Sequence, residues 1–424
     1  MSGGVALSAG ERTAVPREER ERLARDDIAA IVILLFAAMD LSSWADRLSV
    51  DPLFLRVLWV LFYLAAAARL VQRFGAAWLT WTIRHQPALC LLLTSTLASS
   101  TWSLTPSPTL QKAVSLLGTT VLGVFIGYTC RPPALMRTLW WTFAVLIVGG
   151  IAAEMVSPAP VGDRIRQLGW SGIMEYKNSF GAAAALATIF FLVVTVSRCF
   201  HPLWGGALSA LSAFATAQSR SRASLVTLGF TLAVSAYLAV AWTTRRPRRA
   251  MSQRMALGLV LGVGVLPFLI APLSTVVGNR DPLNSRTHLW AGTLTILGER
   301  PLTGYGYETV WGRESATLLP HIEVTARPFA ENAHNSVVHV ASELGIPAAI
   351  LACIYLFGTL RNAARLVERE PSAFSAFALA FVIAMMVLGF AEAHLLRIHS
   401  VFWILFVAVT LAVQRSLPRD DGAR

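Results

Sequence analysis

The sequence contains few charged residues, and this shortage decides the class of protein. Charged side chains make up 14% of the 424 residues and hydrophobic ones make up 55%, with a mean hydropathy of +0.58. A soluble protein of ordinary composition carries about 25% charged residues. The composition therefore excludes an ordinary water-soluble enzyme and predicts an all-α polytopic membrane protein.

Lysine and cysteine are also scarce. The formal net charge is +12, yet Lys112 and Lys177 are the only lysines, so the basic excess is arginine at the ends of apolar segments. This distribution is typical of a membrane topology signal and does not indicate nucleic-acid binding. The four cysteines imply no disulfide framework.

Apolar runs occur along most of the chain. Because a transmembrane helix needs around 20 mostly apolar residues, the sequence predicts about twelve spans. The charged segment 1–27 before the first run fits an uncleaved anchor better than a signal peptide. The predicted spans lie near 28–44, 51–70, 88–104, 110–129, 138–157, 180–197, 203–217, 223–242, 255–273, 336–358, 373–391 and 398–414.

The arginine bias of the short loops predicts the orientation. Most arginines, including those of the run Arg245–Arg249, fall on the side that holds both termini, which we expect to be cytoplasmic. In a bacterial inner membrane the long loop then faces the periplasm. The expected organisation is a cytoplasmic tail over 1–27, transmembrane helices 1–9 over 28–273, a large periplasmic loop over 274–333, transmembrane helices 10–12 over 334–414, and a cytoplasmic tail over 415–424.

The long loop carries the most specific local patterns. From Leu289 onward the apolar residues cluster on part of a helical surface, which predicts a short helix at the membrane interface. Ser285 is a plausible N-cap for this helix, and Pro301 is expected to end it. Gly304 and Gly306 then permit a tight turn. A glycine pair alone is weak evidence for phosphate binding.

Short motifs in a fixed order give the chain a family resemblance. Their order, spacing and sidedness over roughly residues 90–400 resemble the O-antigen ligase and polysaccharide polymerase superfamily, whose members are membrane glycosyltransferases that use undecaprenyl-pyrophosphate-linked glycans. Asp281-Pro282 and the turn Tyr305–Tyr307 look closest to the exopolysaccharide polymerase branch. The motifs are Trp102–Pro106, Tyr176–Gly181, Ser221–Ser224, Arg286–Trp290, Glu299–Gly306, His334–Ser336 and Glu343–Pro347.

The resemblance implies a donor with a pyrophosphate leaving group, which needs fixed cations at the membrane surface. Arginine suits this role because its planar fork makes bidentate, charge-assisted bonds to phosphate oxygens. Arg222 matches the Ser-Arg-small pattern of the superfamily, and the other candidates are Arg286, Arg220 and Lys177. External arginines run against the positive-inside bias, which favours function. The alternative is that they only anchor the chain at the interface.

His334 is the candidate general base that activates the hydroxyl group of the acceptor. An imidazole ordinarily titrates near neutral pH, so this role needs little tuning. Direct attack on the anomeric carbon would invert its configuration. Glu331 and Glu343 are possible partners that orient the imidazole, and the sequence does not choose between them. His288 and His339 are candidates for residues that support the reacting groups without touching the substrate, and a plain polar loop histidine is the alternative for His334.

The external loops lack the usual metal-binding spacings. They contain no Asp-x-Asp pair, His-x-x-x-His pair or cysteine pair, so the sequence predicts metal-independent chemistry without a cofactor. The expected partners are an undecaprenyl-pyrophosphate-linked glycan donor, a sugar or lipid-glycan acceptor and the lipid bilayer, but no nucleic acid. Ligase and polymerase both fit. A lipid-linked glycan flippase or secondary transporter is the main competing interpretation, favoured by Asp40 and Glu154 within spans, and a structural envelope subunit is a third.

Overall fold

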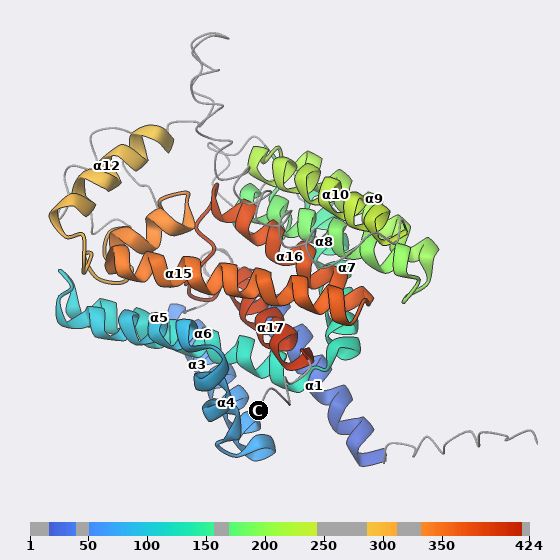
Figure 1. The fold of residues 1–424 in the computed structure, drawn as a ribbon, viewed down its shortest axis with the longest axis horizontal. Coiled ribbons are helices and arrows are strands. Elements are labelled where there is room, and N and C mark those ends of the chain that lie inside the picture. The colour runs from blue at the N-terminus through green and yellow to red at the C-terminus, as the bar shows by residue number, and fades with distance from the viewer. Residues whose placement is uncertain (1–16, 40–50, 157–168, 244–285, 312–331, 418–424) are drawn as a thin grey trace, which may run out of the picture.

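The computed structural model describes residues 17–39, 51–156, 169–243, 286–311 and 332–417. All regular structure in these ranges is helical, as the sequence predicts (Figure 1). The helices are α1 (Arg17–Ala38), α3 (Pro52–Phe74), α4 (Ala77–His85), α5 (Pro87–Ala98), the 3-10 helix η1 (Ser99–Thr101), α6 (Pro106–Thr129), α7 (Pro132–Val156), α8 (Lys177–Ser197), α9 (Pro202–Gln218), α10 (Arg222–Thr243), α12 (Arg286–Glu299), α15 (Ser336–Arg369), α16 (Ala373–Gly389) and α17 (Val401–Ser416).

Five of the described helices are long and apolar enough to cross a membrane, namely α3, α6, α7, α8 and α15. Shorter apolar helices include α16 and α17. Every predicted span overlaps a described helix except 255–273, which lies outside the described residues. The class of all-α membrane protein is therefore confirmed, and the number of twelve spans stays a prediction.

Ion pairs join three helices at the side that the sequence predicts to be cytoplasmic. The buried carboxylate of Asp26 in α1 pairs with Arg69 at 3.1 Å and with Arg73 at 2.6 Å, both from α3. The neighbouring Asp27 pairs with Arg137 of α7 at 2.8 Å. Arginines that the topology rule assigns to one side are thus brought to the same end of the bundle.

Small residues allow α6 and α17 to pack backbone against backbone. A Cβ atom on Gly123 would lie 2.8 Å from the carbonyl oxygen of Ile404, and one on Gly127 would lie 2.8 Å from that of Ala408. Two glycines four residues apart, on one face of α6, are the usual means of such close contact between membrane helices. The almost completely buried α17 is therefore a central element of the bundle.

Helix α15 bends sharply at Gly345, which has φ +84°, and Pro347 follows two residues later. The bend leaves a short N-terminal section of α15 that lies beside α12 (Figure 1). The amide of Ile346 donates to the carbonyl of Pro301 at 2.8 Å, and that of Gly306 donates to the carbonyl of Glu343 at 2.9 Å. The loop between α12 and residue 311 is therefore fixed on the bend.

The predicted tight turn at Gly304 and Gly306 provides this backbone contact. Gly304 has φ +61°, and a Cβ atom there would lie 2.4 Å from the carbonyl carbon of Glu343. The indole nitrogen of Trp102, in the segment between η1 and α6, donates to the carbonyl of Thr303 at 3.0 Å. Three motifs that lie far apart in the sequence thus meet here. The contacts described for Gly304 and Gly306 are backbone hydrogen bonds and close packing between these segments.

Candidate functional site

The predicted site residues gather at the N-terminal ends of four helices. Lys177 begins α8, Arg222 begins α10, Arg286 begins α12 and Ser336 begins α15. Helices α8 and α10 pack together, as do α12 and α15. The first turn of a helix has unpaired N–H groups and a partial positive charge, so it favours an anion. The ends of α8, α10 and α12, each with a cationic first residue, make this region suitable for a phosphorylated ligand.

Glu392, in the segment between α16 and α17, joins these helix ends. Its Oε1 atom accepts hydrogen bonds from Nδ2 of Asn178 and from the guanidinium of Arg286, each at 2.9 Å. Its Oε2 atom lies 2.8 Å from Nδ1 of His334. The hydroxyl of Ser336 donates to the Glu392 backbone carbonyl at 3.0 Å. One buried residue therefore ties α8, α12 and the start of α15 together.

The surroundings of Glu392 keep its carboxyl group ionised. Burial raises its pKa, but the hydrogen bond and charge of His334 and the charges of Arg286 and His394 outweigh burial, so the net pKa is lowered. An ionised carboxylate only accepts hydrogen bonds, and Nδ1 of His334 must therefore carry the proton. In the neutral imidazole the lone pair then lies on Nε2. The His334 side chain is 33% exposed.

Hydrogen bonds around His334 hold its backbone in an uncommon conformation. Its φ is +48°, a left-handed value that few residues other than glycine adopt. Its amide donates to Oδ1 of Asn332 at 2.7 Å, and the indole nitrogen of Trp290 donates to the carbonyl of Ala333 at 2.8 Å. The next residue, Asn335, caps α15 by accepting from two amides of its first turn. Strained positions of this kind persist where their surroundings fix them, and they cluster at functional sites.

The other predicted cations lie around Lys177. The charges of Arg220 and Arg222 both act on the Lys177 ammonium group. Arg220 has φ +50° in the junction between α9 and α10. Helices α8 and α10 can come close because Gly181 has no side chain: a Cβ atom there would lie 2.8 Å from the hydroxyl of Ser224 in α10. The structure thus brings together three predicted phosphate ligands. One of them, Lys177, directly precedes Asn178, which contacts Glu392.

Arg286 has donors for more than one partner in this arrangement. One of its terminal nitrogens pairs with Glu392, and the side chain is 21% exposed. A guanidinium has five N–H donors, so the ion pair leaves donors for a second anion. Arg286 can therefore orient Glu392 and also face a phosphate group.

The carboxylate that contacts His334 belongs to Glu392. The sequence predicts Glu331 or Glu343 for this position. Glu343 is buried one helical turn after His339 and faces that histidine. Glu331 and the side chain of His288 lie outside the described residues. Glu392 takes the orienting position, and the sequence prediction overlooked it. Its only local signal is that it is an acidic residue in a short segment between two apolar runs.

Glu154, which favours a transporter when the sequence is read alone, has a structural partner. Its Oε1 atom accepts hydrogen bonds from the amides of Ser171 and Gly172, at 2.8 and 2.9 Å. The carboxyl group of Glu154 therefore fixes the segment that leads into α8. Asp40 lies outside the described residues.

We expect acidification to lower the free energy of unfolding, because His394 is buried and takes up a proton less readily in the folded protein than in the unfolded chain. Burial lowers the pKa of His394 to about 4; the Glu392 carboxylate opposes this shift, and Arg397 adds to it. An unfolded histidine takes up a proton near pH 6.5. Between these values the unfolded state binds more protons, so stability is lost as the pH falls from 6.5 towards 4, by at most roughly 1.4 kcal/mol per pH unit.

Thermal unfolding in detergent, followed at several pH values, measures this effect. In His394→Gln the decline of the unfolding temperature between pH 6.5 and 4 should be shallower than in the native protein. Equal slopes for the two proteins would contradict the assignment. His85→Gln, which changes an exposed histidine of α4, is the matched control and should keep the native slope.

Comparison with known proteins bears on the central part of the chain. Residues 207–353 match a family model described as O-Antigen ligase. This range contains Arg220, Arg222, Arg286 and His334. Lys177 and Glu392 fall outside the matched range. No curated protein matches the chain.

Proposed function

We propose that the protein transfers a glycan from undecaprenyl pyrophosphate to a sugar acceptor, a reaction that the match of residues 207–353 to the O-antigen ligase family model supports. The transfer takes place at the periplasmic face of a bacterial inner membrane, with both termini of the protein in the cytoplasm. The observation that carries the proposal is that Glu392 pairs with both His334, at 2.8 Å, and Arg286, at 2.9 Å. A base and an anion-binding group thus lie next to each other.

His334 is the proposed general base. Its Nε2 atom accepts the proton of an acceptor hydroxyl as the hydroxyl oxygen attacks the anomeric carbon of the donor sugar. The new glycosidic bond forms on the face opposite the leaving group, so the configuration inverts. Glu392 keeps the required tautomer and stabilises the imidazolium that results, in the manner of the carboxylate in other histidine-carboxylate pairs.

The leaving group is undecaprenyl pyrophosphate. The bond between the anomeric carbon and the phosphate oxygen breaks, and its electron pair stays on the pyrophosphate. Arg222 and Arg286 stabilise the developing charge, with Arg220 and Lys177 beside them and the ends of α8, α10 and α12 adding positive potential. Groups already fixed in the protein require little reorganisation during the reaction.

A lipid-linked glycan flippase is the runner-up. A transporter usually places its polar residues near the middle of the membrane and around internal cavities. In the described part of this chain the polar cluster lies at helix N-terminal ends and in the segment 390–400. This distribution supports transfer at one face. Ligation of a finished polymer and polymerisation of repeat units use the same donor chemistry, and the proposal includes both.

Transfer is expected to need no divalent cation, because fixed cations bind the pyrophosphate. The test uses purified protein, a lipid-linked glycan donor and a glycan acceptor, with product measured in excess EDTA at a low temperature where the protein stays folded. Product should form at an unchanged rate. A rate that EDTA abolishes, and that added Mg²⁺ restores without any change in folding, would contradict metal-independent chemistry.

A further inference from the structure

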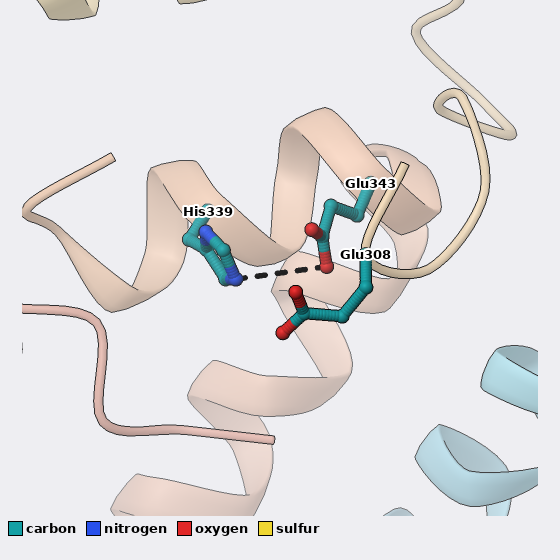
Figure 2. A group of neighbouring side chains, drawn as sticks. All are labelled: Glu308, His339 and Glu343. Atoms are coloured by element: carbon teal, nitrogen blue, oxygen red, sulfur yellow. Dashed lines mark ion pairs between the residues drawn. The ribbon is translucent and has the colours of Figure 1, made fainter. Parts of the chain in front are cut away.

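A second cluster of ionisable side chains lies next to the site and has no part in the proposed reaction. It consists of Glu308, in the segment after the Tyr305–Tyr307 turn, and of His339 and Glu343, one turn apart in the short N-terminal section of α15. One ligand atom from each residue lies within 4.8 Å of the others. Figure 2 shows the imidazole and the two carboxyl groups directed at a common point.

Two members of this cluster are buried without the hydrogen bonds that such groups need. The side chains of His339 and Glu343 are each 1% exposed. Both ring nitrogens of His339 and the Oε1 atom of Glu343 make no hydrogen bond to any described residue. Most buried polar atoms in proteins have a partner, and leaving one without costs about 1–3 kcal/mol. Three such atoms in one place indicate a bound species that satisfies them.

The separation of His339 and Glu343 fits two ligands of one metal ion better than a direct hydrogen bond. Nε2 of His339 and Oε2 of Glu343 are 3.6 Å apart, which is too long for a good N–H···O hydrogen bond. Zn²⁺ binds imidazole and carboxylate at about 2.0–2.2 Å, so two ligands of one tetrahedral ion lie roughly 3.4 Å apart. The observed separation is close to this value.

The third ligand is held in place from outside the cluster. Oε1 of Glu308 accepts a hydrogen bond from Arg397 at 2.7 Å, and the Glu308 carbonyl accepts one from Nζ of Lys112 at 2.9 Å. Metal-binding carboxylates are commonly oriented by such outer partners. The Lys112 contact fixes the Glu308 backbone and the Arg397 contact orients its side chain, so the second carboxylate oxygen can face an ion.

We propose that Glu308, His339 and Glu343 bind a divalent transition-metal ion of the Zn²⁺ or Mn²⁺ class. One imidazole and two carboxylates are ligands that these ions accept. The ion joins the segment around Glu308 to the section of α15 that begins just after His334. Its role is structural, and the inference does not depend on the proposed function. The sequence predicts no metal because Glu308 comes from a separate segment, so no short spacing reveals the site.

Zinc binding by the full-length purified protein tests this proposal. The protein is treated with EDTA, equilibrated with Zn²⁺ alone and desalted, and bound zinc is measured by mass spectrometry; affinity is measured by competition with a chromophoric chelator. The native protein should hold about one Zn²⁺ per chain. His339→Gln and Glu343→Gln should each weaken zinc affinity at least ~10-fold, and His85→Gln should not.

Thermal unfolding of the native protein supplies a readout that needs no variant to fold. Zn²⁺ should raise the unfolding temperature of the EDTA-treated native protein, because an ion that binds only the folded state stabilises it. Native protein that retains less than about a tenth of an ion per chain, with no thermal shift, would overturn the proposal. Equal zinc affinity in native, His339→Gln and Glu343→Gln proteins would overturn it too. In that case a shared proton, and no metal, neutralises the buried carboxyl groups.

Discussion

The substitution His334→Ala is expected to lower the rate of glycan transfer by roughly 10²–10⁴-fold, the usual effect of removing a positioned base. The variant should insert and fold, because one partly exposed loop side chain contributes little to the packing of the helices. Donor binding should persist, since the cations and not the imidazole hold the pyrophosphate. The measurement is the single-turnover rate with saturating lipid-linked donor, together with the donor Kd.

Two further substitutions separate a base from a merely polar contact. His321→Ala changes another histidine of the long loop and should leave the rate nearly native. Glu392→Gln removes the charge that fixes the His334 tautomer, so it should lower kcat with little change in KM and should alter the pH profile of the rate. A well-expressed His334→Ala protein with near-native transfer would contradict the mechanism and favour the flippase.

Arg222→Ala and Arg286→Ala are each expected to slow transfer by roughly 10²–10³-fold, the range seen when one fixed donor to a developing negative charge is removed. Charge-assisted hydrogen bonds contribute about 1.5–3 kcal/mol each, and a guanidinium can make two to one phosphate. Arg→Lys should restore little activity because a lysine lacks the fork. Arg286 should have the larger effect, since its loss also removes the ion pair that it makes with Glu392.

The arginine prediction is measured as kcat and donor Kd for each variant. Arg300→Ala provides the control, because Arg300 lies in the same part of the chain and stacks on the Tyr305 ring at 5.0 Å. It should keep near-native kinetics if the effect is specific to the pyrophosphate site. Unchanged kinetics in Arg222→Ala and Arg286→Ala would leave these arginines as interface anchors.

Most helices could be predicted from the sequence because their apolar runs are long and end at proline, glycine or arginine. The predicted span 110–129 corresponds to α6, and 373–391 corresponds to α16. The early start of α1 at Arg17 was missed because its first turns are charged and have no apolar pattern. Helix α4, with nine residues, is too short to be recognised as a span.

Candidate site residues could be proposed from the sequence only where they form local motifs. His334 and Arg222 stand in short recognisable patterns, and the structure brings the cations of three helix ends towards a common region. Glu392 and the buried set around Glu308 have no such pattern, because their contacts join segments that lie far apart in the sequence. The bend of α15 at Gly345 likewise depends on a backbone contact with Leu302 that no local pattern encodes.

The most direct test of the proposed transfer uses sealed vesicles that contain the purified protein in one known orientation. Labelled donor and acceptor are supplied only at the face that carries the long loop, and both the glycan product and the movement of donor to the other leaflet are measured. The account predicts product at this face without donor movement, and a rate roughly 10²–10⁴-fold lower in His334→Ala. Movement of donor across the membrane with no glycosidic product would contradict it.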